Sequence, residues 1–226
     1  MSVLIIENDV SSGPGRLLDW LDQRGTAATV VRAWDGEEIP PTIDGYAALV
    51  LLGGGMLPDE DERSPWLPAE RELLRAAHGR VPVLGICLGG QLVAHTFGGE
   101  VRGAYGLPEK GVTSLSVVAE DPLLVGLGSS VRAVESHQDQ ITRLPDDAVL
   151  VMSSERCPVQ MLRIGQTWGV QFHPEAAADR VRRWDVERLQ TMGFEPAAVF
   201  EDADRYADEL ERTWSTVFGR FLDLAA

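Results

Sequence analysis

Residues 81 to 99 read VPVLGICLGGQLVAHTFGG, and this stretch decides how the chain is interpreted. An apolar strand over Val81–Ile86 runs through Cys87 directly into a helix predicted over Leu88–Phe97. The segment GICLG (residues 85 to 89) matches the G-x-nucleophile-x-G elbow, with cysteine in the place of serine. Its glycines permit a sharp turn that lifts the side chain clear of the sheet. A sulfur at a helix N-terminus is favoured as thiolate, so the elbow predicts a nucleophile.

Short apolar runs alternate with helical patterns before this elbow. Strands are predicted over Val3–Ile6, Thr29–Ala33 and Ala47–Leu52, and helices over Arg16–Gln23 and Glu70–His78. Continuous apolar strands that alternate with helices indicate a mostly parallel sheet with both faces covered. The expected fold class is therefore α/β.

After Gly99 the pattern changes to short strands separated by turn signals. These candidates are Val112–Val118, Val131–Val134, Ala148–Met152, Val159–Arg163 and Trp168–Phe172. We expect a small antiparallel region here. Residues 1–176 are interpreted as one domain and residues 177–226 as a helical C-terminal extension packed on it. The segment Gly193–Pro196 predicts a break of this extension into two helices.

Composition excludes several classes of protein. The 226 residues are 44% hydrophobic and 24% charged, which is typical of a globular protein. With a formal net charge of −15, neither nucleic acid nor a membrane is expected as a partner. Two cysteines do not form a disulfide framework, and no metal-binding spacing occurs. Without a signal-peptide pattern or a long apolar run, we expect a cytoplasmic protein.

A cysteine nucleophile needs a base and a group that orients the base. His78 is expected to be a solvated surface group, and His95 lies two helical turns beyond the elbow. His173 follows a strand, and Pro174 restricts it to extended conformations. In an extended chain His173 and Glu175 point the same way, so Glu175 can accept the imidazole N–H.

Other residues suggest how the site is completed. Gly53–Gly55 follow a strand of the same sheet, so a backbone N–H there could pair with the Leu88 N–H to hold an oxyanion. A phosphate-binding turn is the weaker alternative, because GxGxxG and GK[ST] are absent. Gln91 lies one helical turn after Cys87, where it could hold the far end of a substrate. Cys157, in the turn-like SERCPV segment, is expected to be a small buried apolar residue.

With these residues in place, the chain resembles the class I, or triad-type, glutamine amidotransferases. GICLGGQ (residues 85 to 91) and QFHPE (residues 171 to 175) carry the resemblance. Residues 136 to 175 and the GGGM turn are most similar to the branch that includes the glutaminase domain of GMP synthetase. The resemblance covers about residues 2 to 176 and implies a flavodoxin-like fold, with a mostly parallel sheet flanked by helices.

The resemblance also implies a reaction. Cys87 would attack the glutamine side-chain amide and form a γ-glutamyl thioester. His173 would act as general acid and base, oriented by Glu175. The N–H groups of Gly54 and Leu88 would stabilise the oxyanion. Water would then release glutamate, and ammonia would pass to a separate synthetase subunit, with no cofactor or metal required.

The remaining substrate contacts follow from the same resemblance. Gln91 would contact the amino-acid end of L-glutamine, and the backbone around Ser136 and His137 would complete that pocket. Gly55 stands where the family usually has proline, and Gln138 stands where its Ser-His-Gly-Asp pattern has glycine. No SGGxDS-type loop occurs, so a complete GMP synthetase is not expected.

Three functions remain open at this point. The first is a glutaminase that supplies a synthetase. The second is a stand-alone γ-glutamyl hydrolase or peptidase acting on γ-glutamyl conjugates, for which Glu109, Lys110 and the segment around Tyr105 are candidates to contact the leaving group. The third is a non-catalytic binding module. The apolar residues of the helical extension also allow a surface for a partner or for a homo-oligomer.

Overall fold

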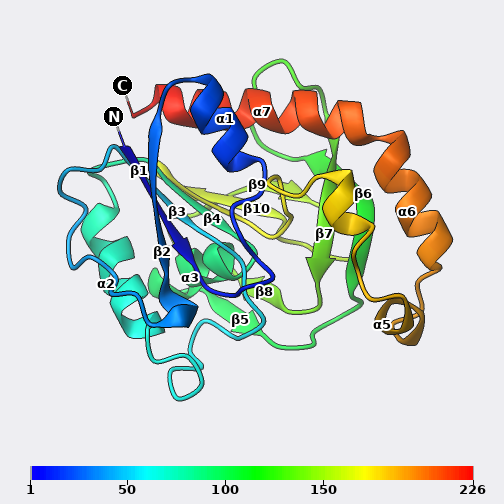
Figure 1. Cartoon of the computed structure of the whole chain (residues 1–226), viewed down its shortest axis with the longest axis horizontal. Coiled ribbons are helices and arrows are strands. Elements are labelled where there is room, and N and C mark those ends of the chain that lie inside the picture. Colours follow the sequence, from blue (N-terminus) through cyan, green and yellow to red (C-terminus); the bar gives the residue numbers. More distant parts are fainter. Residues whose placement is uncertain (1, 226) are drawn as a thin grey trace.

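A nine-stranded sheet forms the centre of the computed structural model, which describes residues 2–225 (Figure 1). The strand order is β2-β1-β3-β4-β11-β10-β9-β6-β7. The strands are β1 (Ser2–Glu7), β2 (Ala27–Arg32), β3 (Ala48–Leu51), β4 (Val83–Ile86), β6 (Glu109–Val117), β7 (Ser130–His137), β9 (Val149–Ser153), β10 (Met161–Ile164) and β11 (Thr167–Val170). Neighbours from β2 to β11 pair in parallel, and those from β11 to β7 pair antiparallel. The predicted α/β fold is confirmed, and the antiparallel strands extend the same sheet.

A second, two-stranded sheet pairs β5 (Glu100–Arg102) with β8 (Gln140–Arg143). Neither strand is predicted from the sequence. Segments of three and four residues are too short to display a periodic pattern, so only pairing across the fold defines them.

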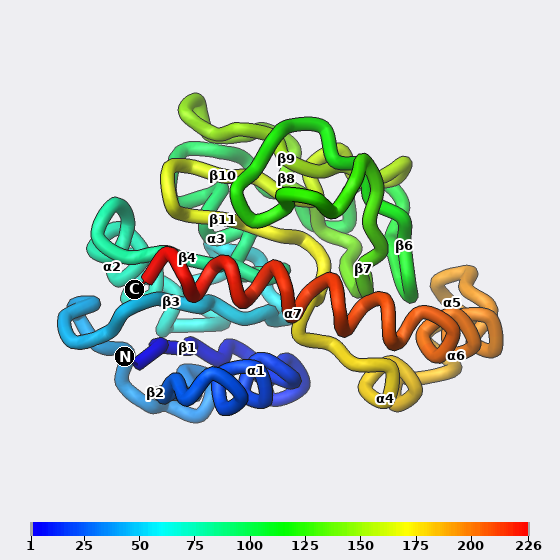
Figure 2. The backbone as a smooth tube through the Cα atoms, turned by 90° about the horizontal axis from the view of Figure 1, so that it is seen from above, coloured from blue at the N-terminus to red at the C-terminus, as the bar shows by residue number. Residues whose placement is uncertain are grey.

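Helices cover both faces of the large sheet. They are α1 (Leu17–Gln23), α2 (Leu67–Ala77), α3 (Leu88–Thr96), α4 (Ala178–Val181), α5 (Val186–Thr191), α6 (Pro196–Arg205) and α7 (Ala207–Asp223), with a 3-10 turn at Ala33–Asp35. Buried side chains of α1 and α7 belong to one core cluster, and those of α2 and α3 belong to the other. Figure 2 shows α7 crossing the strands, with α4 to α6 at the end where β6 and β7 lie. No helix among residues 2–225 has the length and apolarity to cross a bilayer.

The C-terminal segment forms four helices, where two were predicted. Gly193 adopts a φ of 83° between α5 and α6, and a further break at Tyr206 separates α6 from α7. In α7, Trp214 and Phe221 are buried on the sheet side. The Trp214 ring lies 4.5 Å from the ring of Phe172, and its indole N–H donates to the Arg132 carbonyl at 2.9 Å. The domain boundary at residue 176 stays a prediction.

The Trp214→Ala substitution tests the contribution of α7 to stability. Trp214 is 1% exposed, so truncation leaves a large cavity and an unpaired carbonyl. We expect the free energy of unfolding to fall by about 3–5 kcal/mol, measured by urea denaturation. Leu107→Ala, at a side chain that is 61% exposed, is the control and should stay within about 0.5 kcal/mol of the parent. Equal losses for the two variants would contradict the role of α7.

Candidate active site

Cys87 occupies a strained turn between β4 and α3. Its φ of 53° and ψ of −107° are rare for a residue with a side chain, and such strain costs about 1–3 kcal/mol. The Cys87 N–H donates to the Val170 carbonyl at 2.8 Å, which fixes the turn against β11. Helix α3 begins at the next residue, Leu88. The sulfur is therefore held at a helix N-terminus beyond the end of the strand.

Three glycines allow the backbone to pack this closely. A Cβ atom on Gly85 would collide with the Gly89 carbonyl, and one on Gly89 would collide with the Leu51 carbonyl. A Cβ on Gly90 would meet the carbonyl of Val170. Helix α3 thus lies directly on β3 and β11, and a side chain at any of these positions would push it away.

His173 and Glu175 lie beyond the end of β11. The His173 N–H donates to the Val134 carbonyl at 2.8 Å, and its Nδ1 lies 2.8 Å from Oε1 of Glu175. An Arg180 Nη1 also lies 3.5 Å from that carboxylate oxygen. Both His173 and Glu175 are buried. The imidazole is consequently fixed in orientation by its backbone and by its ring.

The charges of this group support one another. Burial opposes a charge on His173, but the Glu175 carboxylate and a hydrogen bond with Cys87 outweigh it and raise the pKa of His173 to about 10. Burial likewise opposes a charge on Glu175, yet His173 and Arg180 hold the pKa of that carboxyl below its usual range. The structure therefore brings Cys87, His173 and Glu175 together as a nucleophile, a base and an orienting carboxylate.

The glycine turn after β3 lies against the elbow. A Cβ on Gly53 would come 3.3 Å from Cε1 of His173 and 3.5 Å from Cβ of Cys87. One on Gly54 would come 2.8 Å from Cδ2 of Leu88. Leu88 opens α3, so its N–H is one of the four that have no acceptor within the helix. The Gly54 and Leu88 backbones are thus neighbours beside the sulfur.

A buried polar network braces this turn from below. The Asn8 side-chain amide donates to the Leu52 carbonyl at 3.2 Å and to Oε1 of Glu70 at 3.0 Å. The Trp66 indole N–H donates to Oδ1 of Asn8 at 2.8 Å. Burial raises the pKa of Glu70 to about 8. This network is not predicted from the sequence, where Glu70 stands only as a polar position in a helix.

The Glu70→Gln substitution should change how stability depends on pH. Glu70 keeps its proton to about pH 8 in the folded state and releases it from about 4.5 when unfolded. Stability therefore falls as pH rises through this window, by an amount on the order of a few kcal/mol. Glutamine retains the acceptor for Asn8 and cannot ionise. Urea unfolding at several pH values should give a flatter profile for the variant, and two parallel profiles would contradict the shift.

Gln91 reaches the nucleophile through a second amide. Its Nε2 donates to Oε1 of Gln171 at 3.3 Å and to the Asp139 carbonyl at 3.5 Å. The Gln171 Nε2 in turn lies 3.8 Å from the Cys87 sulfur. Both glutamines are buried. Gln91 and Gln171 therefore form a fixed amide pair behind the sulfur.

A cleft of about 820 Å³ opens beside His173. Its walls come from the loop between β1 and α1, from β6 and β7, and from the segment that carries α4 and α5. Ser136 of β7 and Lys110 of β6 meet there, where the Lys110 ammonium donates to Oγ of Ser136 at 2.7 Å. This is the space in which a substrate could meet His173.

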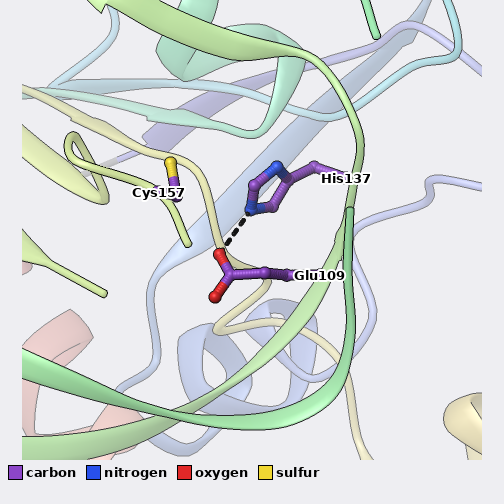
Figure 3. A group of neighbouring side chains, drawn as sticks. All are labelled: Glu109, His137 and Cys157. Atoms are coloured by element: carbon purple, nitrogen blue, oxygen red, sulfur yellow. Dashed lines mark hydrogen bonds and ion pairs between the residues drawn. The ribbon is translucent and has the colours of Figure 1, made fainter. Parts of the chain in front are cut away.

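A second set of buried cysteine, histidine and glutamate lies nearby. Figure 3 shows the His137 ring pointing at the Glu109 carboxylate, with Cys157 beside them. Nε2 of His137 is 3.1 Å from Oε2 of Glu109 and 3.3 Å from Oε2 of Glu135. One potential ligand atom from each of Glu109, His137 and Cys157 falls within 4.8 Å of the others. The set has the composition of a catalytic triad or a metal site, and no pattern in the sequence predicts that these residues meet.

The charges in this second set favour an ion pair. Burial opposes a charge on His137, but Glu109 and Glu135 raise its pKa to about 10, so both ring nitrogens hold protons at neutral pH. A doubly protonated ring offers no lone pair to a metal or to a thiol proton. Cys157 is 0% exposed, its thiol donates to the Val159 carbonyl at 3.3 Å, and burial raises its pKa far above the usual range. The arrangement suits a buried structural ion pair that fixes the backbone at His137.

The environment of His78 differs from the prediction. Its Nδ1 lies 2.9 Å from Oγ1 of Thr167, and its ring lies 4.6 Å from the ring of Phe97. The end of α2 faces the sheet here, which takes the ring out of full solvent contact. His78 therefore packs between elements and is not a freely solvated group.

Comparison with known proteins places this geometry in context. Residues 11–183 match the family model described as glutamine amidotransferase class-I. The glutamine-hydrolyzing subunit of GMP synthase from Methanopyrus kandleri is 34% identical over 157 residues, which cover 68% of this chain and 79% of that protein. The glutamine amidotransferase-like protein YfeJ of Salmonella typhimurium is 30% identical over 191 residues, covering 80% and 78%.

The likeness in structure extends further along the chain. A crystal structure of a glutamine amidotransferase from Thermotoga maritima superposes with a TM-score of 0.90 at 27% sequence identity. The superposition covers 99% of this chain and 98% of that one, so it includes the C-terminal helices.

Proposed function

The chain belongs to the class I glutamine amidotransferase family, and from this premise we propose that it hydrolyses the side-chain amide of L-glutamine through Cys87. One observation carries the proposal. Cys87 lies in a strained elbow and hydrogen-bonds His173, whose other ring nitrogen lies 2.8 Å from Glu175. A nucleophile, a base and an orienting carboxylate in that order are the parts that covalent hydrolysis requires.

The first half of the reaction forms the thioester. The Cys87 thiol gives its proton to His173, and the sulfur attacks the amide carbon. The resulting oxyanion accepts hydrogen bonds from the Gly54 and Leu88 N–H groups. His173 then donates its proton to the departing nitrogen, the C–N bond breaks, and ammonia leaves behind a γ-glutamyl thioester. Glu175 stabilises the imidazolium throughout.

The second half of the reaction restores the enzyme. His173 takes a proton from water, which attacks the thioester carbon, and the C–S bond breaks to release glutamate. The proton returns to the Cys87 sulfur. We assign Gln91, Ser136 and the backbone of His137 to the amino-acid end of the substrate, since these residues adjoin the sulfur or the cleft.

The destination of the ammonia belongs to the same proposal. The similarity to the glutamine-hydrolyzing subunit of a GMP synthase supports transfer of ammonia to a separate synthetase subunit. One observation favours the alternative of a stand-alone γ-glutamyl hydrolase. The cleft beside His173 has a volume of about 820 Å³, which is far more than departing ammonia needs. Both functions use the same thioester.

Matched cysteine substitutions separate the two buried cysteine sets. Cys87→Ala should lower glutamate release from L-glutamine by several orders of magnitude, because the nucleophile is removed. Cys157→Ala should retain turnover, because that thiol is protonated and away from the cleft. A coupled assay for glutamate measures both, and circular dichroism checks folding. Loss of turnover in Cys157→Ala with turnover retained in Cys87→Ala would move the site to the residues of Figure 3.

The base and its orienting partner should contribute unequally. His173→Ala removes the only group that carries the proton, whereas Glu175→Gln removes a charge and leaves the ring in place. We expect the loss in kcat for Glu175→Gln to be smaller by about tenfold to hundredfold. Steady-state kinetics with L-glutamine measure the difference. A larger loss for Glu175→Gln would contradict the assigned roles.

A further inference from the structure

Lys110 is the only lysine in the sequence, and it lies in the cleft beside the proposed nucleophile. Its ammonium donates to Oγ of Ser136 at 2.7 Å and lies 5.3 Å from the centre of the Trp184 ring. The neighbouring Glu109 faces the opposite side of β6 and joins the buried ion pair. Of the two adjacent residues, Lys110 is thus the one directed at the cleft.

Arg188 supplies a second cation to the same cleft. Burial and then the charge of Arg188 lower the pKa of Lys110 to about 8, which leaves the ammonium largely charged at neutral pH. Within residues 2–225, neither Lys110 nor the Arg188 guanidinium is ion-paired with a carboxylate, whereas Arg183 of the same cleft pairs with Asp179. In a chain of net charge −15, two such adjacent cations favour an anionic ligand.

The proposed reaction fixes which part of a substrate would lie here. His173 protonates the departing nitrogen, so the leaving group must lie on the His173 side of the sulfur. The cleft begins at His173 and extends past Lys110 to Trp184 and Arg188. A substituent on the departing nitrogen would therefore run along these residues.

We propose that Lys110 and Arg188 bind a carboxylate carried by the leaving group, so that γ-glutamyl amino acids bind better than L-glutamine. This inference rests on the proposed function, whose chemistry it leaves unchanged. The γ-amide C–N bond breaks as the Cys87 thioester forms, His173 protonates the amino group of the departing amino acid, and water releases glutamate. The Trp184 ring offers a flat apolar surface to the side chain of the leaving group.

Binding to the Cys87→Ala protein tests the proposal without turnover. Titration calorimetry compares γ-glutamylglycine, its C-terminal amide and L-glutamine. Charge-assisted hydrogen bonds should make γ-glutamylglycine bind about tenfold to hundredfold more tightly than the amide. Adding Lys110→Met should remove most of this preference, and Lys110→Arg should retain part of it. Adding Arg183→Met, at a cleft residue already paired with Asp179, should leave the preference in place.

Two binding results would overturn the inference. One is no preference for γ-glutamylglycine over its amide, including no binding of either. The other is an equal loss for all three ligands in the Lys110→Met protein, which would assign the cation to the carboxylate of the glutamyl part that they share. Thermal melts of each variant establish that the protein is folded.

Turnover by the protein with Cys87 intact separates this inference from the proposed function. A higher kcat/KM for γ-glutamylglycine than for its amide, lowered by Lys110→Met, is the expected result. Hydrolysis with no such preference would overturn the role of Lys110 alone. Absence of any Cys87-dependent hydrolysis would overturn the proposed function, while the calorimetry still decides whether Lys110 binds the carboxylate.

Discussion

The close approach of α3 to the backbones of β3 and β11 is the constraint on which the site depends. Glycines at positions 89 and 90 let the helix lie on the carbonyls of Leu51 and Val170. That contact leaves Cys87 no relaxed path from strand to helix, so it adopts a φ of 53°. The strain is local, and the packing of an entire helix opposes its relief. The same packing aims the sulfur away from the sheet.

The order of the parallel strands then gathers the remaining groups. β3, β4 and β11 are neighbours in parallel, so the glycine turn, the elbow and the segment with His173 leave the sheet at one edge. The opposite face contributes through Trp214, whose ring packs on Phe172, directly before His173. The C-terminal helices thus support the base from one side, and α5 adds Arg188 to the cleft.

The groups close together in sequence could be predicted, and those assembled across the fold could not. The elbow and the pair His173–Glu175 are short segments whose geometry follows from strand and turn rules, so their residues identified a nucleophile and a base. Glu70 is different, because its burial depends on Asn8, which lies 62 positions away in the chain. The four C-terminal helices and the strands β5 and β8 were also missed, since their ends are set by packing and not by periodicity.

Two buried sets of cysteine, histidine and glutamate in one chain show that composition alone does not define a site. His173 has one carboxylate on one ring nitrogen, which leaves the other nitrogen to exchange a proton with Cys87. His137 has two carboxylates on a single nitrogen and a backbone carbonyl 3.2 Å from the other, which hold both of its protons. Cys87 is strained and adjoins His173, whereas Cys157 is satisfied by a carbonyl in a sealed interior. The chemistry therefore follows from the free nitrogen and the strained backbone, which only the first set has.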